Sequence, residues 1–215
     1  MNNRRPEELL AKGVDELGLP ISRGQIDAFM IYLSELKRWN RAYNLTGLKK
    51  DEDIVIKHFL DSLLYLKVLP QDAVIIADVG SGAGFPGMPI KIMRPETEMY
   101  LVEPTGKKAA FLRHMIKPLL LNKVHVIEKR VEATDPRDMR APADAAVTRA
   151  LFDVGDFMKK ASHIVKAGGT LILNKGPKAE EELKALKGAA FEILSCRLPL
   201  TDITRHIIVL RTTEG

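Results

Sequence analysis

The sequence predicts an α/β fold in which helices cover a mostly parallel, seven-stranded sheet and a helical segment precedes it. Three observations carry this prediction. Apolar residues recur at helical spacing through the first seventy residues, short apolar strands alternate with helices from residue 72 onward, and the last two strands are joined without a helix. Alternation at this spacing favours a parallel sheet covered on both faces. The short final link requires an antiparallel pair, which we expect at the sheet edge.

Helices are expected throughout the first seventy residues. The first helix follows Pro6, a residue favoured in the first helical turn, and is broken at Gly18. Ser22 is a candidate N-cap for the second helix, whose apolar stripe reaches Trp39. A third helix is predicted over residues 51–66, with apolar side chains along one face.

From residue 72 the sequence alternates between predicted strands and predicted helices. The strands are expected at 73–79, 98–103, 124–128, 144–148, 169–174, 190–196 and 205–211. The helices are expected at 87–93, 106–120, 153–166 and 178–187. Residues 71–215 should therefore form the main domain, and residues 1–70 a helical extension belonging to the same structural unit.

Composition narrows the class of protein. Hydrophobic residues make up 46% and charged residues 28% of the chain, which is the balance of a globular protein. No apolar run approaches the ~20 residues of a membrane helix, and the N-terminus lacks the apolar segment of a secretory signal. The single Cys196 cannot form an intramolecular disulfide, which fits a cytoplasmic protein. A net charge of +5 is compatible with a polyanionic partner but identifies none.

The segment from Asp78 to Gly87 is the most informative part of the sequence. Asp78 ends an apolar strand, and four glycines follow within residues 80–87. Glycine has no Cβ and accepts positive φ, so such a loop lets main chain approach a ligand closely. The spacing of Gly82, Gly84 and Gly87 also satisfies the dinucleotide-binding pattern. A loop that serves turn geometry alone is the third interpretation.

Asp78 distinguishes a dinucleotide ligand from a cationic nucleoside ligand. Its position is normally apolar in a dinucleotide-binding strand, and a carboxylate there would repel a pyrophosphate. It would attract the ammonium group of S-adenosylmethionine, which also carries a sulfonium cation and has no phosphate. Seven strands with a closing antiparallel hairpin are likewise typical of the class I, Rossmann-like methyltransferases. The residues therefore favour S-adenosylmethionine as the cofactor.

Two further segments extend the predicted cofactor site. Glu103 ends the second strand, 23 residues after Gly80, where a carboxylate can accept hydrogen bonds from both ribose hydroxyls. Val131 and Glu132 follow the third strand, where a main-chain N–H and an acidic side chain can read the edge of an adenine. Alone, Glu103 could be a solvated strand-end residue, and the second segment an ordinary surface turn.

With these segments in place, the chain resembles the ribosomal RNA small subunit methyltransferase G family, also called the glucose-inhibited division protein B family. The resemblance covers nearly the whole chain. It is carried by Trp39-Asn40, Asn44-Leu45-Thr46, the block from His58 to Ser62, the loop from Asp78 to Gly87, Lys107-Lys108, Phe111-Leu112, Arg130-Val131-Glu132, Thr148-Arg149-Ala150 and Lys175-Gly176.

The resemblance implies transfer of a methyl group from S-adenosylmethionine to N7 of a guanine in the 16S ribosomal RNA of the small ribosomal subunit. It implies a cytoplasmic protein that acts as a monomer. The family's cofactor contacts fall at Gly80, Phe85, Val131, Glu132 and Arg149. The sequence departs from the family at the ribose position, where Glu103-Pro104 replaces an acidic residue followed by Ser, and at Thr148, where Ser is common.

The residues are compatible with ring-nitrogen chemistry. Guanine N7 carries an exposed lone pair and no proton, so its methylation requires no general base. The sequence lacks the Asn-Pro-Pro-Tyr motif that amino-methyltransferases place after the fourth strand, and Cys196 lies in the terminal hairpin, away from any expected site. Arg149 is the predicted catalytic residue, with a bond to the cofactor carboxylate, guanine O6 or a phosphate. A structural salt bridge is its alternative role.

The predicted site residues fall into two groups, and no cluster of His, Cys and Asp suggests a metal site. The cofactor group comprises Asp78, Gly80, Ser81, Gly82, Gly84, Phe85, Glu103, Val131, Glu132 and Arg149. The RNA-binding group comprises Lys107, Lys108, Arg113 and Lys175. His58 and Trp39 are expected to be packed side chains.

Two functions from other classes stay open. A nicotinamide-dependent oxidoreductase is disfavoured by Asp78 and by the lack of a second nucleotide-binding half. A non-catalytic RNA-binding protein of ribosome assembly, with a vestigial pocket, is disfavoured because Asp78, Glu103 and Arg149 are all present.

Overall fold

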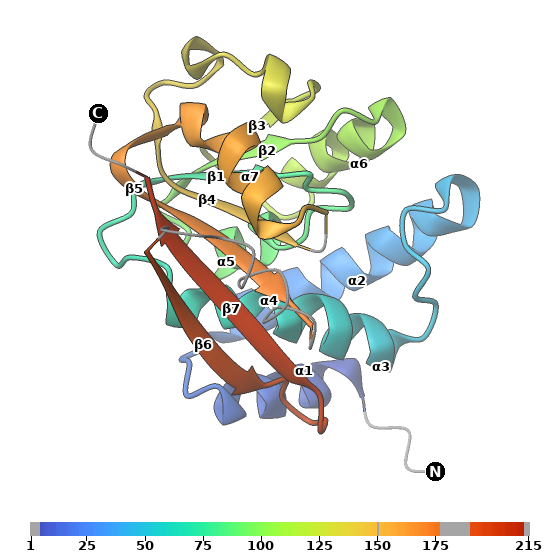
Figure 1. The fold of residues 1–215 in the computed structure, drawn as a ribbon. Helices are drawn as coiled ribbons and strands as arrows, with labels where there is room; N and C mark the ends of the chain where they lie inside the picture. The colour runs from blue at the N-terminus through green and yellow to red at the C-terminus, as the bar shows by residue number, and fades with distance from the viewer. Residues whose placement is uncertain (1–4, 150, 177–189, 213–215) are drawn as a thin grey trace.

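The structure is a computed structural model that describes residues 5–149, 151–176 and 190–212. Within these residues a seven-stranded sheet lies between layers of helices (Figure 1). The strands are β1 Ile75–Val79, β2 Glu98–Val102, β3 Val124–Ile127, β4 Ala143–Arg149, β5 Val165–Lys175, β6 Phe191–Arg197 and β7 Thr204–Arg211. Their order across the sheet is β3-β2-β1-β4-β5-β7-β6.

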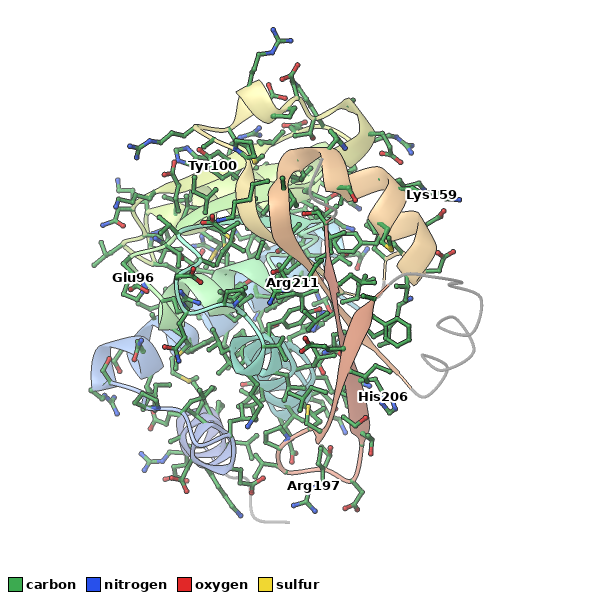
Figure 2. The ribbon with its side chains drawn as sticks, turned by 60° about the vertical axis from the view of Figure 1, so that its left-hand side comes forward. Glu96, Tyr100, Lys159, Arg197, His206 and Arg211 are labelled. Carbon is green, nitrogen blue, oxygen red and sulfur yellow. The ribbon has the colours of Figure 1, made fainter. Side chains whose placement is uncertain are left out.

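The sheet topology confirms the predicted fold class. Strands β1 to β5 run parallel, whereas β7 is antiparallel to both β5 and β6. Figure 2 shows His206 and Arg211 at opposite ends of β7, in the C-terminal hairpin. Because β1 to β5 are parallel, their carboxyl ends share one edge of the sheet, and the segments that follow them meet there.

The helical segments follow the predicted order. They are α1 Pro6–Glu16, α2 Arg23–Tyr43, α3 Asp51–Ile54, the π-helical η1 Val55–Leu60, α4 Asp61–Leu63, η2 Leu64–Lys67, α5 Gly87–Met93, α6 Gly106–Ile116, η3 Val131–Ala133, η4 Pro136–Asp138, α7 Val154–Ala161 and η5 Ser162–Ile164. Ser22 caps α2 as expected: its hydroxyl accepts the N–H of Gln25 at 3.2 Å, and the Gln25 side chain accepts the N–H of Ser22 at 2.8 Å. The predicted helix at 178–187 lies outside the described residues.

Three predicted helices differ from the structure. The helix predicted at 106–120 is too long, because α6 ends at Ile116. The segment predicted at 51–66 is helical, but its middle six residues form the π-helix η1. The helix predicted at 153–166 is wrong at its end, because α7 stops at Ala161 and β5 already begins at Val165. A register shift between β4 and β5, with Gly168 at a φ of +70°, lets this early part of β5 pair with β4 before the main ladder.

The two faces of the sheet have separate apolar cores. On one face, side chains of α1, α2, η1, α5 and α6 pack together with the sheet, and the core includes Leu10, Tyr32, Phe59, Phe111 and Ile172. On the other face, Val154 and Phe157 of α7 pack on Val79, Val102 and Leu173. The N-terminal helices thus share a core with the sheet.

The described helices include none that is long and apolar enough to cross a membrane.

Candidate active site at the carboxyl edge of the sheet

The predicted cofactor-site residues come together at the carboxyl edge of the parallel strands. Asp78 lies in β1, Glu103 follows β2, Val131 follows β3 and Arg149 ends β4. Ligands of open α/β sheets bind outside this edge, where loops from neighbouring strands converge. The structure therefore unites residues that lie more than 70 positions apart in the sequence.

Close packing makes glycine necessary in the loop after β1. A Cβ on Gly87 would lie 2.7 Å from Oδ2 of Asp78, and a Cβ on Gly84, where φ is +96°, would lie 2.5 Å from the hydroxyl of Tyr32. Tyr32 in turn donates its hydroxyl to the main-chain oxygen of Ala83 at 2.5 Å. The loop is therefore held in a fixed shape by the helical extension on one side and by Asp78 on the other.

Asp78 is a fully buried carboxylate, and one of its oxygens lacks a hydrogen-bond donor in the described part of the chain. Its Oδ2 accepts the N–H of Gly87 at 2.8 Å, while its Oδ1 contacts no hydrogen-bond donor among the described residues. Burial raises the pKa of Asp78 to about 7, and the Gly87 N–H and the Arg149 charge act against this rise. A buried carboxylate oxygen without a donor suits a cationic ligand group, because such a group would restore the missing interaction.

Glu103 ties the glycine loop to the second strand. The residue is 3% exposed; its Oε2 accepts the N–H of Gly82 at 2.8 Å, and its Oε1 accepts the N–H of Thr105 at 2.9 Å. An ionised carboxylate has about four acceptor positions, so both oxygens can still accept a hydroxyl. The predicted role of Glu103 towards a ribose remains a prediction, and the loop contact is a role that the sequence did not indicate.

Two cavities at this edge of the sheet share Gly80 in their linings. The first, of about 210 Å³, is lined by Val79, Gly80, Val102, Pro104, Arg130, Val131, Glu132, Leu151, Phe152 and Lys160. The second, of about 160 Å³, is lined by Leu45, Thr46, His58, Gly80, Ser81, Gly82, Ala83, Phe85 and Arg149. The predicted adenine segment and the glycine loop thus line neighbouring cavities.

A third cavity lies beyond Arg149. It has a volume of about 420 Å³ and is lined by Thr46, Gly47, Leu48, Lys57, His58, Asp61, Arg149, Asn174, Lys175, Gly176 and Arg205. Thr46, His58 and Arg149 line both the second and the third cavity. These three residues therefore lie between the glycine loop and a larger chamber, most of whose lining residues are polar or charged.

Arg149 is held in place by the π-helical segment. Its guanidinium donates to the main-chain oxygen of Lys57 at 3.0 Å, contacts Nδ1 of His58 at 2.9 Å and lies 3.4 Å from Oδ2 of Asp61. It also lies over the ring of Phe85, 5.2 Å from the ring centre. The salt bridge that the sequence left as an alternative is present, and the side chain nevertheless lines two cavities.

His58 is a neutral, packed side chain. Burial, together with the adjacent Arg149 charge, lowers the pKa of His58 to about 3. Because Nδ1 faces a guanidinium donor, the network assigns the ring proton to Nε2, which lies 2.7 Å from Oγ1 of Thr46. The His58 ring stacks on Phe85 with ring centres 4.4 Å apart. His58 thus orients Arg149 without carrying a charge.

Asp61 and Arg205 are site residues that the sequence did not single out. Asp61 is 3% exposed, and its Oδ1 accepts a hydrogen bond from Nε of Arg205 at 2.7 Å. Nδ2 of Asn174 lies 3.2 Å from the same oxygen. Asp61 therefore joins the helical segment to β5 and β7. The His58–Ser62 block was the signal in the sequence, but its partners lie far along the chain.

Comparison with known proteins identifies the family. Residues 25–200 match the family described as rRNA small subunit methyltransferase G. The chain belongs to this family. Proteins named Ribosomal RNA small subunit methyltransferase G from Acetivibrio thermocellus and Pelotomaculum thermopropionicum are 36% and 38% identical to it, in alignments that cover 95% of this chain and 87% and 89% of theirs.

Solved structures support the methyltransferase fold. A predicted O-methyltransferase from Agrobacterium tumefaciens is similar with a TM-score of 0.54 and 24% identity, over 71% of this chain and 78% of that chain. TrmN from Thermus thermophilus is similar with a TM-score of 0.53 and 13% identity, over 82% of this chain and 52% of that chain. At these identities the likeness concerns the fold alone.

The predicted RNA-binding residues lie in two separate places in this member of the family. Lys175 lines the third cavity and donates to the main-chain oxygen of Phe152. On α6, Lys107 is exposed, Lys108 is half-buried, and Arg113 forms an ion pair with Glu128 at 2.7 Å. The described lining of the three cavities contains Lys175 but none of the α6 residues.

The described ranges contain no group of three or more His, Cys, Asp or Glu side chains that could hold a metal ion.

Proposed function

We propose that the protein transfers a methyl group from S-adenosylmethionine to N7 of a guanine in the 16S ribosomal RNA of the small ribosomal subunit. The buried Asp78 carboxylate beside the glycine loop, with one oxygen that lacks a hydrogen-bond donor within the residues that the structure describes, is the observation that carries the proposal. Family membership supports the class of RNA. The N7 position of guanine and the 16S molecule are proposed in addition to that class.

The residues present fit S-adenosylmethionine. Asp78 supplies a negative charge for its ammonium group, and Glu103 supplies acceptors for its ribose hydroxyls. Val131 and Glu132 line the cavity in which the adenine would lie, next to Gly80. When bound, S-adenosylmethionine supplies a methyl group on a sulfonium centre. A pyrophosphate in the same place would meet two buried carboxylates, which disfavours a nicotinamide dinucleotide.

The chamber beyond Arg149 is the place for the acceptor base. Arg149 lines both this chamber and the cavity of the glycine loop, so its guanidinium lies between the cofactor and the base. A donor to guanine O6 leaves the N7 lone pair free, whereas a bidentate contact to both atoms would block it. Alignment of the two reactants is worth several kcal/mol of the barrier, and Arg149 is the group held to provide it.

No general base is required for this reaction. Guanine N7 carries no proton, and methylation leaves the positive charge on the purine. His58 is neutral and already bonded at both ring nitrogens, so it holds Arg149 rather than moving a proton. The site therefore acts by binding, orientation and charge.

The same proposal includes the wider setting of the protein. We propose a cytoplasmic monomer that needs no metal, with residues 1–70 as a helical extension and 71–215 as the catalytic domain. The ribosomal substrate supports the cytoplasmic location. The shared core supports one structural unit.

Methyl transfer tests the proposal directly. Small ribosomal subunits from a strain that lacks the endogenous enzyme are incubated with the protein and methyl-labelled S-adenosylmethionine, and the rRNA is digested and mapped by mass spectrometry. We expect one 7-methylguanosine in 16S rRNA and none without the protein. Label on an exocyclic amine contradicts the N7 assignment. Calorimetry with both ligands is the second arm: binding of NADH without binding of S-adenosylmethionine contradicts the whole proposal.

A further inference from the structure

We propose that the end of α2 and its connection to α3 form the surface that docks the phosphodiester backbone of the RNA substrate, with Arg41 and Lys49 as its contacts. This inference rests on the proposed function and adds the route by which the RNA reaches the site. Figure 1 shows the connection at the edge of the molecule, between the light-blue α2 and the α3 label. The surface belongs to the helical extension, whereas the predicted RNA contacts on α6 do not.

The cavity on this surface and the catalytic chamber share a lining residue. A cavity of about 410 Å³ is lined by Lys37, Asn40, Arg41, Asn44, Leu48 and Lys49. Leu48 also lines the 420 Å³ chamber that contains Arg149. An RNA strand lying along Arg41 and Lys49 would therefore pass over Leu48 into the chamber proposed for the target base.

The cations on this surface are available to an anionic partner. Arg41, Lys49 and Lys50 are exposed, and none of them forms an ion pair with another described residue. Arg38, by contrast, lies 2.5 Å from Glu35, and Arg113 lies 2.7 Å from Glu128. Cations without a carboxylate partner release counterions when they meet phosphates, and this release drives binding to nucleic acids.

The connection presents Lys49 from a fixed backbone. The side chain of Asn40 donates to the main-chain oxygen of Thr46 at 3.0 Å and accepts its N–H at 2.9 Å. Oγ1 of Thr46 accepts the N–H of Leu48 at 3.2 Å and lies 2.7 Å from Nε2 of His58. Since His58 also contacts Arg149, the docking surface and the catalytic side chain share one hydrogen-bond network. A preformed surface loses little entropy on binding.

An exposed aromatic ring lies at the same end of α2, on the side that carries Trp39 and outside the lining of the 410 Å³ cavity. Tyr43, in the last turn of α2, is 45% exposed, and its ring centre lies 5.3 Å from that of Trp39. Single-stranded RNA is recognised by stacking of unpaired bases on such rings, between cations that hold the backbone. Cations without an ion-pair partner among the described residues, next to the chamber proposed for a nucleobase, favour RNA over an acidic protein as the partner.

A double charge reversal tests the docking surface. R41E/K49E is compared with K117E/R211E, which changes the net charge equally at the opposite edge of the sheet. Lys117 follows the end of α6 at that edge. Arg211 is the last residue of β7, as Figure 2 shows. Lys117 and Arg211 are exposed and form no ion pair with another described residue. The measurement is equilibrium binding of each protein to small-subunit rRNA at several salt concentrations.

We expect R41E/K49E to bind the rRNA at least about ten-fold more weakly than the wild type at moderate salt. Its plot of log affinity against log salt should be shallower by roughly 1.4 to 1.8, because each lost phosphate contact removes about 0.7 to 0.9 from the slope. K117E/R211E should bind within about two-fold of the wild type. Calorimetric affinity for S-adenosylmethionine should be equal in all three proteins, which shows that the site is intact.

The outcomes separate this inference from the proposed function, because binding is measured without methyl transfer. If R41E/K49E binds rRNA as tightly as K117E/R211E, the docking surface is overturned, whatever the enzyme transfers. If the wild type binds rRNA through Arg41 and Lys49 but transfers no methyl group, the docking surface stands and the proposed reaction fails.

Discussion

Asp78 is a carboxylate whose ionisation is set by the fold. Burial raises its pKa from 3.8 to about 7. The folded state therefore favours the protonated form. The resulting stability is fully present below pH 3.8 and is lost as the pH rises through about 7. Asp78→Asn should remove this loss, so the free variant should be more stable than the wild type at pH 8, as thermal unfolding would show.

The same titration should govern cofactor binding. In the proposed complex, ionised Asp78 would attract the cationic groups of S-adenosylmethionine, whereas protonated Asp78 would not. We expect the affinity for S-adenosylmethionine to increase from pH 5.5 to pH 7.5 in calorimetric titrations of the wild type. In Asp78→Asn the affinity should be lower and nearly independent of pH over this range. Equal pH profiles for the two proteins would contradict the assignment.

Arg149 combines a structural ion pair with the proposed catalytic role. Arg149→Ala should lose about 10²-fold or more of the methyl-transfer rate, the usual cost of removing a donor aimed at the transition state. Arg149→Lys should also be impaired, because an ammonium cannot reproduce the guanidinium contacts to Lys57, His58 and Asp61. Single-turnover assays measure both variants. Asp61 keeps Arg205 as a partner, so circular dichroism should show folded proteins. Turnover near the wild-type rate would refute the role.

Among the secondary-structure elements, η1 has a direct consequence for the site. Its π-helical pairing was not visible in the sequence, because apolar spacing predicts that a segment is helical but not which carbonyl each N–H contacts. In the structure the main-chain oxygen of Lys57, within η1, accepts the Arg149 guanidinium. Irregular helical turns of this kind often occur at functional sites.

Helix α1 packs against η1 through a glycine. A Cβ on Gly13 would lie 2.2 Å from Cδ1 of Leu60, which is fully buried and cannot move aside. Gly13→Ala should therefore lower the free energy of unfolding by about 1–3 kcal/mol. Gly24→Ala is the matched control in α2, where a Cβ would meet nothing within 4 Å, and it should be neutral or stabilising by up to about 1 kcal/mol. Urea denaturation measures both; equal effects would contradict the close contact.

At the scale of the whole molecule, the extension and the sheet should unfold together. Trp39 is the only tryptophan and lies in α2, so its fluorescence reports on the extension, whereas far-ultraviolet circular dichroism reports on the whole fold. Since both regions share one apolar core, the two signals should follow a single transition in denaturant. Two separate transitions would show that residues 1–70 fold as a unit of their own.

Local patterns predicted the architecture better than the site network. The strands, their mostly parallel direction and the terminal hairpin follow from alternation and from short links, which are local properties. Glu103 and the glycine loop were also visible, because they follow strand ends. The pairing of Asp61 with Arg149 and Arg205 was not, since 88 and 144 residues separate the partners. Such contacts depend on how the layers pack, and no local spacing encodes that.

The bond between Gly82 and the Glu103 carboxylate has a consequence for recognition. It fixes the glycine turn to the neighbouring strand through groups of the protein itself. Amide hydrogen exchange at Gly82 should accordingly be slow before any nucleoside arrives and should change little afterwards. The nucleoside would then bind to a preformed loop. Selectivity would come from the charge and shape of that loop rather than from a closing movement.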